Sequence, residues 1–287
     1  MKESCARNAL PGWPPERRIA FLGLWSCPSD TCYREGLPSH QVAGEANEEQ
    51  LMTALEVYAE RLLATRKILN SLFNVVNEAN ATLHAANHCL ELLLERMQRY
   101  ANDKLVQISA SASLFYLIRH LHIENISLLC VRKLVLLLVE ALERYPQDNT
   151  VVRNCCLTLC KVKTPDQILF LYERLLKVLL RIAEHPPSSQ DNFPQRIAMH
   201  LLNVIVCQVN DPGKRLFGDV GGVQVALTIL EQRLKDNAEH DDVVDTCWSL
   251  LWNVTDETAP NCRLFIYLGG LELFVRCMKK WPDHKEL

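Results

Sequence analysis

Apolar residues recur with helical spacing over most of the chain, from residue 47 onward. Near the C-terminus, Cys247, Leu250, Leu251 and Val254 follow the i, i+3, i+4, i+7 pattern of a helix with one buried face. Similar patterns predict helices at 47–77, 83–100, 104–121, 126–145, 149–162, 166–185, 194–208, 222–236, 241–255, 260–268 and 271–281. Proline, glycine or asparagine stands between most of these segments, where helices are expected to end.

The first 46 residues follow a different pattern. Residues 1–16 contain closely spaced prolines, so they are predicted to form a disordered leader. Residues 17–26 alternate between apolar and polar and predict one strand, with no partner strand in the rest of the chain. Residues 27–46 are expected to be a loop. Asn47 then suits the N-cap of the first helix.

An internal repeat indicates how the helices are arranged. Lys214–Phe217 followed by Gly221-Gly222 recurs as Cys262–Phe265 followed by Gly269-Gly270, 48 residues later. Helical repeats of about 40–50 residues are typical of armadillo and HEAT proteins. The sequence therefore predicts an all-α fold, an armadillo/HEAT-like α-solenoid that coils as a right-handed superhelix over residues 47–287. The chain ends where the next third helix is expected, so the last repeat is predicted to be incomplete.

Composition and charge narrow the classes of function. The net charge is −3, so no overall basic field is present to attract nucleic acid or an anionic membrane. No uncharged apolar run is long enough for a membrane span, and no secretory signal is recognisable. The 12 cysteines are therefore expected to be reduced thiols in the cytoplasm or the nucleus.

The sequence contains no recognisable catalytic, phosphate-binding or dinucleotide-binding motif. His84 and His88 have the i, i+4 spacing of metal ligands, but no third ligand is evident, so they are expected to be surface or packing residues. An enzyme with a Cys/His nucleophile pair stays open as an alternative. The expectation is a non-enzymatic protein with no cofactor and no metal.

Three residues on the 241–255 helix and just after it form the candidate site. Trp252 lies beside the buried stripe, and Asp256 follows one turn later on the same side. An indole and a carboxylate together can bind a small cationic group, by cation–π contact and ion pairing. The alternative is a core tryptophan with a solvated aspartate. Leu202-Asn-Val204 recurs as Trp252-Asn-Val254 after 50 residues, and Asn253 could hydrogen-bond a peptide in the groove of an armadillo array.

Leu251–Thr258, Asn261–Phe265 and Gly270–Phe274 resemble segments of the zyg-eleven/zer-one family of cullin-2 substrate receptors. Phe21–Leu24 and Val42–Gln50 are similar to that family's passage from leucine-rich repeats into an armadillo-like array. The resemblance covers residues 17–287 and implies that 17–46 is a leucine-rich-repeat remnant and linker.

Several functional expectations follow from the resemblance alone. Family members are substrate receptors of cullin-2 RING ubiquitin ligases and bind proteins that begin with glycine. Their pocket uses a Trp and an Asp that match Trp252 and Asp256. The family's pocket also uses an Asn and a Glu on the following third helix, which would lie past Leu287. The pocket is therefore expected to be incomplete, so that glycine-initiated peptides bind weakly or not measurably, and the elongin-binding box is expected to be absent from this chain.

Two other hypotheses stay beside this one. The chain could be a generic armadillo-like scaffold that binds a partner segment along its groove, with Trp252 merely packed. It could also be an enzyme with a Cys/His site, which a hydrolase screen would test.

Overall fold

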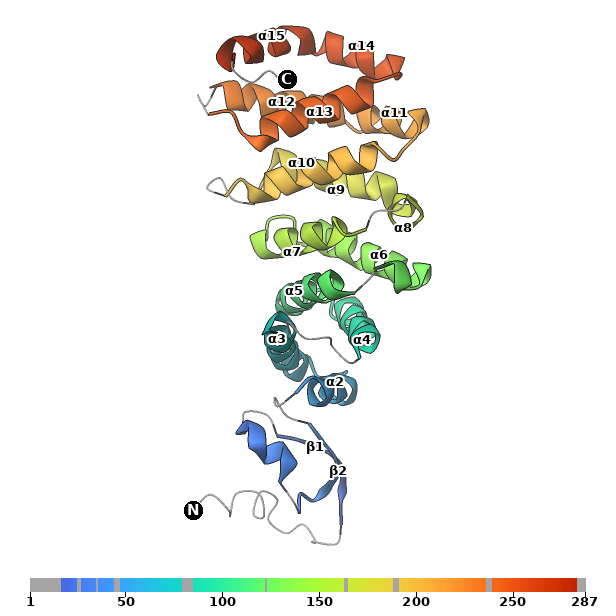
Figure 1. The fold of residues 1–287 in the computed structure, drawn as a ribbon, viewed down its shortest axis with the longest axis vertical. Helices are drawn as coiled ribbons and strands as arrows, with labels where there is room; N and C mark the ends of the chain where they lie inside the picture. Colours follow the sequence, from blue (N-terminus) through green and yellow to red (C-terminus); the bar gives the residue numbers. More distant parts are fainter. Residues whose placement is uncertain are drawn as a thin grey trace. The chain divides into compact units, whose positions relative to one another are not determined.

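A computed structural model describes most of the chain (Figure 1). The described residues are 17–24, 27–34, 36–43, 47–78, 85–121, 123–162, 165–187, 191–235 and 239–282. The leader predicted at 1–16 lies outside them. The chain divides into two compact units, residues 1–121 and residues 122–287. Both consist mostly of helices, and the first also contains a small sheet.

The sheet in the first unit has two parallel strands, β1 (Ile19–Gly23) and β2 (Ser39–Ala43), with the 3-10 helix η1 (Ser29–Tyr33) between them in sequence. Ile19 pairs with Ser39, so the strands are offset by 20 residues. The strand predicted at 17–26 is confirmed, but the prediction that it has no partner was wrong. The partner strand lies inside the predicted loop, where a short, largely polar segment carries no strong strand pattern.

The first unit continues with α2 (Glu48–Val57), α3 (Leu62–Glu78), α4 (Ala86–Arg99) and α5 (Lys104–His120). Asn47 caps α2 as predicted, because its side-chain oxygen accepts the Gln50 backbone N–H at 3.0 Å. Helix α2 packs against α3, and α3 and α4 both pack against α5.

The single helix predicted at 47–77 is in fact two helices, separated at residues 58–61. No proline or glycine marks this break. Instead, the Ala59 carbonyl accepts a hydrogen bond from the Tyr100 hydroxyl at 2.7 Å. The Tyr58 ring lies edge-on to Phe21, with centroids 5.3 Å apart. Contacts with β1 and with the end of α4 thus accompany the break, and local periodicity cannot predict them.

All the regular elements of the second unit within its described residues are helices. Its elements are η2 (Ile123–Asn125), α6 (Leu128–Arg144), α7 (Asn149–Leu159), α8 (Pro165–Ile168), η3 (Leu169–Leu171), α9 (Tyr172–Glu184), α10 (Phe193–Val206), α11 (Asp211–Asp219), α12 (Gly222–Lys235), α13 (Asp242–Thr255), α14 (Ala259–Tyr267) and α15 (Gly270–Lys280). Elements that are close in sequence pack together, such as α9 with α10, α10 with α13, and α12 with both α13 and α15 (Figure 1). The helix predicted at 166–185 is divided into α8, η3 and α9.

The glycine pairs of the repeat have a clear structural reason. Gly221 and Gly269 have φ angles of +88° and +78°, a conformation that favours glycine. The next glycine in each pair, Gly222 or Gly270, lies directly against the ring of the phenylalanine five residues earlier, where a methyl group would overlap the ring. The two helix pairs α11–α12 and α14–α15 are therefore built in the same way, as the 48-residue interval predicted.

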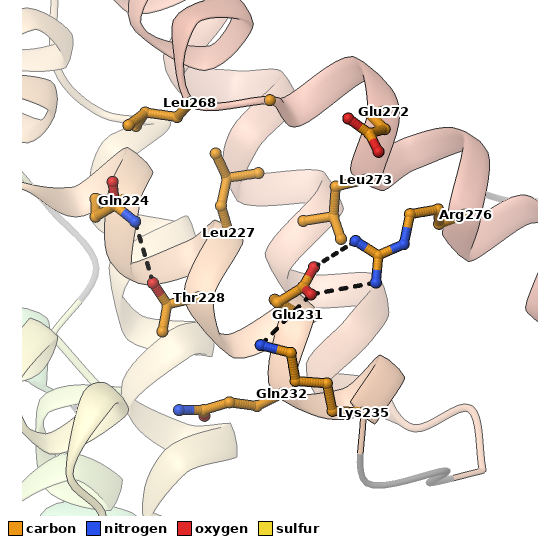
Figure 2. Close-up of a pocket in the computed structure, with 11 residues that line it drawn as sticks. Gln224, Leu227, Thr228, Glu231, Gln232, Lys235, Leu268, Glu272, Leu273 and Arg276 are labelled. Atoms are coloured by element: carbon orange, nitrogen blue, oxygen red, sulfur yellow. Dashed lines mark hydrogen bonds and ion pairs between the residues drawn. The ribbon is translucent and has the colours of Figure 1, made fainter.

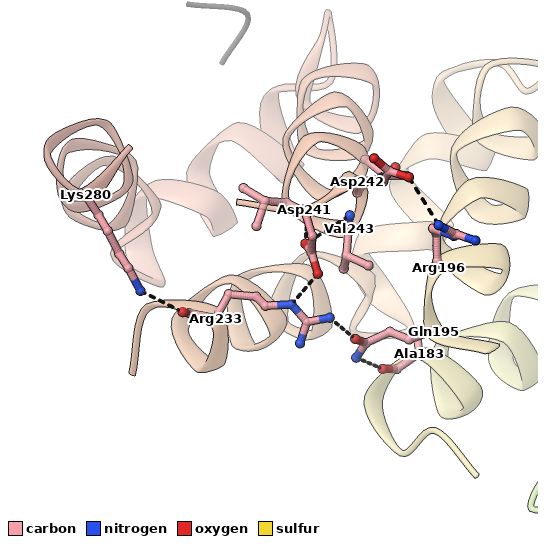
Figure 3. A network of polar contacts seen from close by, with 10 residues as sticks. Ala183, Gln195, Arg196, Arg233, Asp241, Asp242, Val243 and Lys280 are labelled. Atoms are coloured by element: carbon pink, nitrogen blue, oxygen red, sulfur yellow. Dashed lines mark hydrogen bonds and ion pairs between the residues drawn. The ribbon is translucent and has the colours of Figure 1, made fainter. Parts of the chain in front are cut away.

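A polar network joins several helices of the second unit (Figure 3). The Arg233 guanidinium, near the end of α12, donates to Asp241 Oδ2 at 3.0 Å and to Gln195 Oε1 at 2.7 Å. Gln195, on α10, donates to the Ala183 carbonyl of α9 at 2.7 Å. Lys280, at the end of α15, donates to the Arg233 carbonyl at 3.1 Å. This network fixes the start of α13, since Asp241 is the N-cap residue of that helix.

None of the helices within the described residues has the length and apolar character needed to span a membrane.

Candidate functional site

Helix α13 carries the candidate site and is anchored on one side. Asp241 caps it by accepting the backbone N–H groups of Val243 and Val244. The four residues predicted to form the buried face, Cys247, Leu250, Leu251 and Val254, are all buried. Because this stripe packs against the neighbouring helices, the residues on the opposite side of α13 are left open.

Trp252 lies on this open side with 75% of its surface exposed. The alternative of a core tryptophan is therefore wrong. Trp248, one turn earlier, is half-buried. Its ring packs edge-on against the ring of Phe274 on α15, and the two ring centroids lie 5.2 Å apart. Of these two tryptophans, only Trp252 is free to contact a ligand with its ring.

Asp256 lies where α13 ends. Its backbone N–H still donates to the Trp252 carbonyl at 2.9 Å, but its ψ of 122° is no longer helical, and the next residue, Glu257, has a φ of +55°. The helix end predicted at residue 255 is confirmed. The Asp256 side chain is 59% exposed. An exposed indole and an exposed carboxylate therefore stand one turn apart at the C-terminal end of one helix.

The Asp256 carboxylate has a cationic neighbour that the sequence analysis missed. The Lys214 ammonium of α11 donates to the Asp256 backbone carbonyl at 3.1 Å and lies 3.9 Å from Asp256 Oδ2. The Lys214 carbonyl in turn accepts from the buried side chain of Asn261, which also donates to the Val254 carbonyl. In the sequence, Lys214 stands out only as the first residue of the repeated segment. Its contact with Asp256, 42 residues later, cannot be predicted from the residues around either one.

Asn253 connects α13 with α10. Its Nδ2 donates to Asn203 Oδ1 at 2.8 Å, and Asn203 Nδ2 donates to Ser249 Oγ at 3.0 Å. Asn203 and Asn253 are both half-buried. The two asparagines predicted to be repeat equivalents are thus in direct contact, and the Asn253 amide is engaged within the protein.

The pattern of buried residues aligns α10 with α13 at an interval of 49 residues, whereas the repeated Asn-Val motif suggested an interval of 50. The buried residues Ala198, Leu201, Leu202 and Ile205 precede the buried residues Cys247, Leu250, Leu251 and Val254 by 49 positions each. The 50-residue alignment of Leu202 with Trp252 is therefore off by one. Asn203 corresponds to Trp252, and Cys207 corresponds to Asp256. Helix α10 thus has neither an indole nor a carboxylate at the equivalent positions.

Elsewhere in the described part of the chain, the histidine and cysteine side chains considered from the sequence do not form a comparable site. His88 Nε2 lies 2.8 Å from Glu56 Oε1, while His84 lies outside the described residues. Burial raises the pKa of the Cys155 and Cys247 thiols, which disfavours their reactive thiolate forms. Among the residues that the structure describes, no three His, Cys, Asp or Glu side chains are grouped to hold a metal ion.

A hollow of about 470 Å³ lies between α12 and α15 (Figure 2). Glu231 pairs with the Arg276 guanidinium there at 2.8 and 3.1 Å, and Lys235 lies 3.6 Å from the same carboxylate. The Arg276 guanidinium holds the pKa of the Glu231 carboxyl below its ordinary value. These charges satisfy one another, so we regard the end of α13 as the stronger candidate site.

The described chain is thus a predominantly helical protein of sequentially packed helices, with an open indole and carboxylate at the end of one of them. Residues 94–287 match the family described as "Protein zer-1 homolog-like, C-terminal domain". The chain belongs to this family, as its resemblance to the zyg-eleven/zer-one receptors predicted.

The chain is 36% identical to the "Protein zer-1 homolog" of Drosophila melanogaster over 100% of its own length and 36% of the relative's. It is 37% identical to the Mus musculus protein of the same name, over 99% of this chain and 36% of that protein. Identity to the "Zyg eleven-related protein 1" of Caenorhabditis elegans is 36%, over 94% of this chain and 30% of that protein. The chain therefore spans about a third of the length of these relatives. No solved structure shows a significant match.

Proposed function

We propose that this chain binds the amino terminus of proteins that begin with glycine. The observation that carries the proposal is the exposed pair of Trp252 and Asp256, one turn apart at the end of α13. A free α-amine is a cation with three donors. Asp256 can accept from it, an interaction worth about 1.5–3 kcal/mol for a hydrogen bond to a charged group. Trp252 can cover it for about 0.5–2 kcal/mol more.

In this proposal, glycine is selected by shape and the free amine by charge. A wall close to the first Cα would reject any larger side chain. Acetylation would remove the positive charge and donors that Asp256 and Trp252 recognise. Asn253, whose amide already donates to Asn203, would offer its remaining carbonyl oxygen to a peptide N–H.

We propose that residues 47–287 consist of armadillo-like, solenoid-type helical repeats and that residues 17–46 are a leucine-rich-repeat remnant. The 48-residue repeat of α11–α12 in α14–α15 and the packing of helices in chain order support the solenoid. Two parallel strands offset by 20 residues, with a 3-10 helix between them, match the period of leucine-rich repeats.

The biological setting that we propose is the ubiquitin pathway. The chain would be the recognition region of a substrate receptor for a cullin-2 RING ubiquitin ligase, working in the cytoplasm or the nucleus without catalytic activity of its own. Support comes from family membership and from the indole–carboxylate pair. Contacts with cullin-2 and elongin are proposed for the longer family members, since this chain covers about a third of their length.

A peptide titration tests the recognition. Fluorescently labelled peptides that differ only at the start, Gly, Ser or acetyl-Gly, are titrated with the chain. We expect binding of the Gly peptide that is weak, down to the limit of measurement, and weaker or no binding of the other two. Asp256→Asn should abolish this preference, whereas Asp242→Asn, which removes an exposed acid at the other end of α13, should preserve it. Equal affinity for all three peptides would reject the proposal.

A second candidate is a generic scaffold that binds a partner segment without reading its amino terminus. The contact between Lys214 and Asp256 favours it, because an acid with a lysine nearby can serve the fold alone. Charge reversal by Asp256→Lys separates the two candidates. An unchanged affinity for every bound peptide would favour the scaffold, and a selective loss of free-amine peptides would favour amine recognition.

A further inference from the structure

We infer that Lys214 is an internal competitor for Asp256, which weakens the binding of a free amino terminus and makes the site less sensitive to salt. This inference rests on the proposed function and adds a residue that sets the affinity of the site for a free amino terminus. The relevant geometry is the distance of 3.9 Å between Lys214 Nζ and Asp256 Oδ2. At this distance the two groups attract by charge without forming a direct hydrogen bond.

The hydrogen bond of Lys214 is made elsewhere. Its ammonium donates to the Asp256 backbone carbonyl at 3.1 Å, and its side chain is only 16% exposed. The ammonium is therefore held in place beside the helix end rather than free to move into solvent. The carboxylate itself, at 59% exposure, keeps room for a second donor. A bound amine would thus share Asp256 with a resident cation.

The resident lysine opposes ligand binding for an electrostatic reason. Two positive groups on one carboxylate repel each other, so Lys214, 3.9 Å from Asp256 Oδ2, offsets part of the attraction of this carboxylate for an approaching cation. An uncompensated carboxylate would attract that cation more strongly, and the attraction would weaken as salt is added.

The internal repeat shows that this lysine is not required by the repeat itself. The residue 48 positions after Lys214 is Cys262, which occupies the same place on α14. Its Sγ donates to the carbonyl of Thr255, at the end of the helix that precedes α14, at 3.0 Å, whereas Lys214 contacts the end of a helix that follows α11. The same fold position thus accepts a neutral side chain.

Lys214→Met tests the inference, because methionine keeps most of the buried stem and removes the charge. Affinities for Gly-initiated and acetyl-Gly peptides are measured for the whole chain at 50 and 300 mM salt. We expect Lys214→Met to bind the Gly peptide about threefold more tightly at low salt, to lose that gain at high salt, and to bind the acetylated peptide as before. Lys214→Arg should behave like the wild type.

A matched control is Lys235→Met, which removes a lysine from the end of α12 where it pairs with Glu231. It should leave both affinities unchanged. If Lys214 only holds the helix end in shape, Lys214→Met should weaken binding of the Gly peptide, and this result overturns the inference. An unchanged preference for the free amine also overturns it, while the proposed function stands. If neither protein prefers the free amine, both the inference and the proposed function fail.

Discussion

The phenylalanine of each repeat offers a direct test of how the second unit is held together. Phe217 is fully buried and contacts Gly222, whereas Phe265, its equivalent 48 residues later, contacts Gly270 but is only half-buried. Replacing a fully buried phenylalanine with alanine costs about 3–5 kcal/mol. Because part of the Phe265 ring is already exposed, Phe265→Ala should cost less, about 2–3 kcal/mol.

For each variant, urea denaturation gives the free energy of unfolding and thermal denaturation gives the melting temperature, both followed by circular dichroism. Phe217→Ala should lower the free energy of unfolding by about 4 kcal/mol and the melting temperature by about 10 °C. Phe265→Ala should shift both by smaller amounts, about two thirds of these. Equal losses for the two variants, or a larger loss for Phe265→Ala, would refute the argument that burial, rather than the repeat position alone, decides the stability contribution.

Three further predictions concern the site, the charges and the thiols. Trp252→Ala should change the free energy of unfolding by less than about 0.5 kcal/mol, since the ring is exposed, while it lowers affinity for a Gly peptide severalfold; a large drop in melting temperature would contradict this. The Arg66 guanidinium holds the pKa of the Asp103 carboxyl below 3.8, so this pair's stabilisation is fully present above about pH 4 and is lost as the pH falls through the folded-state pKa; Asp103→Asn should remove that part of the acid dependence in denaturation curves. In mass-spectrometric labelling with iodoacetamide, exposed Cys207 should react well before Cys155, which should react only after unfolding because burial raises the pKa of its thiol; equal rates for these two cysteines would show that the second unit opens readily.

Family membership and the structure address different parts of the proposal. The match over residues 94–287 places the chain among zer-1 homolog-like proteins. The exposed indole and carboxylate supply a chemical reason why this region could bind an amino terminus. The nearby lysine adds an expectation that family membership does not provide, since it concerns how strongly this particular chain holds its ligand.

The sequence by itself determined features that depend on neighbouring residues. The buried face of α13 follows from its apolar spacing, the cap of α2 follows from Asn47, and the helix breaks at Gly221 and Gly269 follow from the glycine pairs. These features were predictable because helix periodicity, capping and backbone freedom act within a few residues.

Only the tertiary structure decided the features that join distant segments. The pairing of β1 with β2, the break at 58–61 beside Tyr100 and the one-residue shift between α10 and α13 depend on contacts across roughly 20 to 50 residues. The same holds for Lys214 beside Asp256, which lie 42 residues apart. No local pattern predicts such contacts, because they form only when whole helices pack against one another. Each of the two segments would form the same helix or strand pattern without the contact.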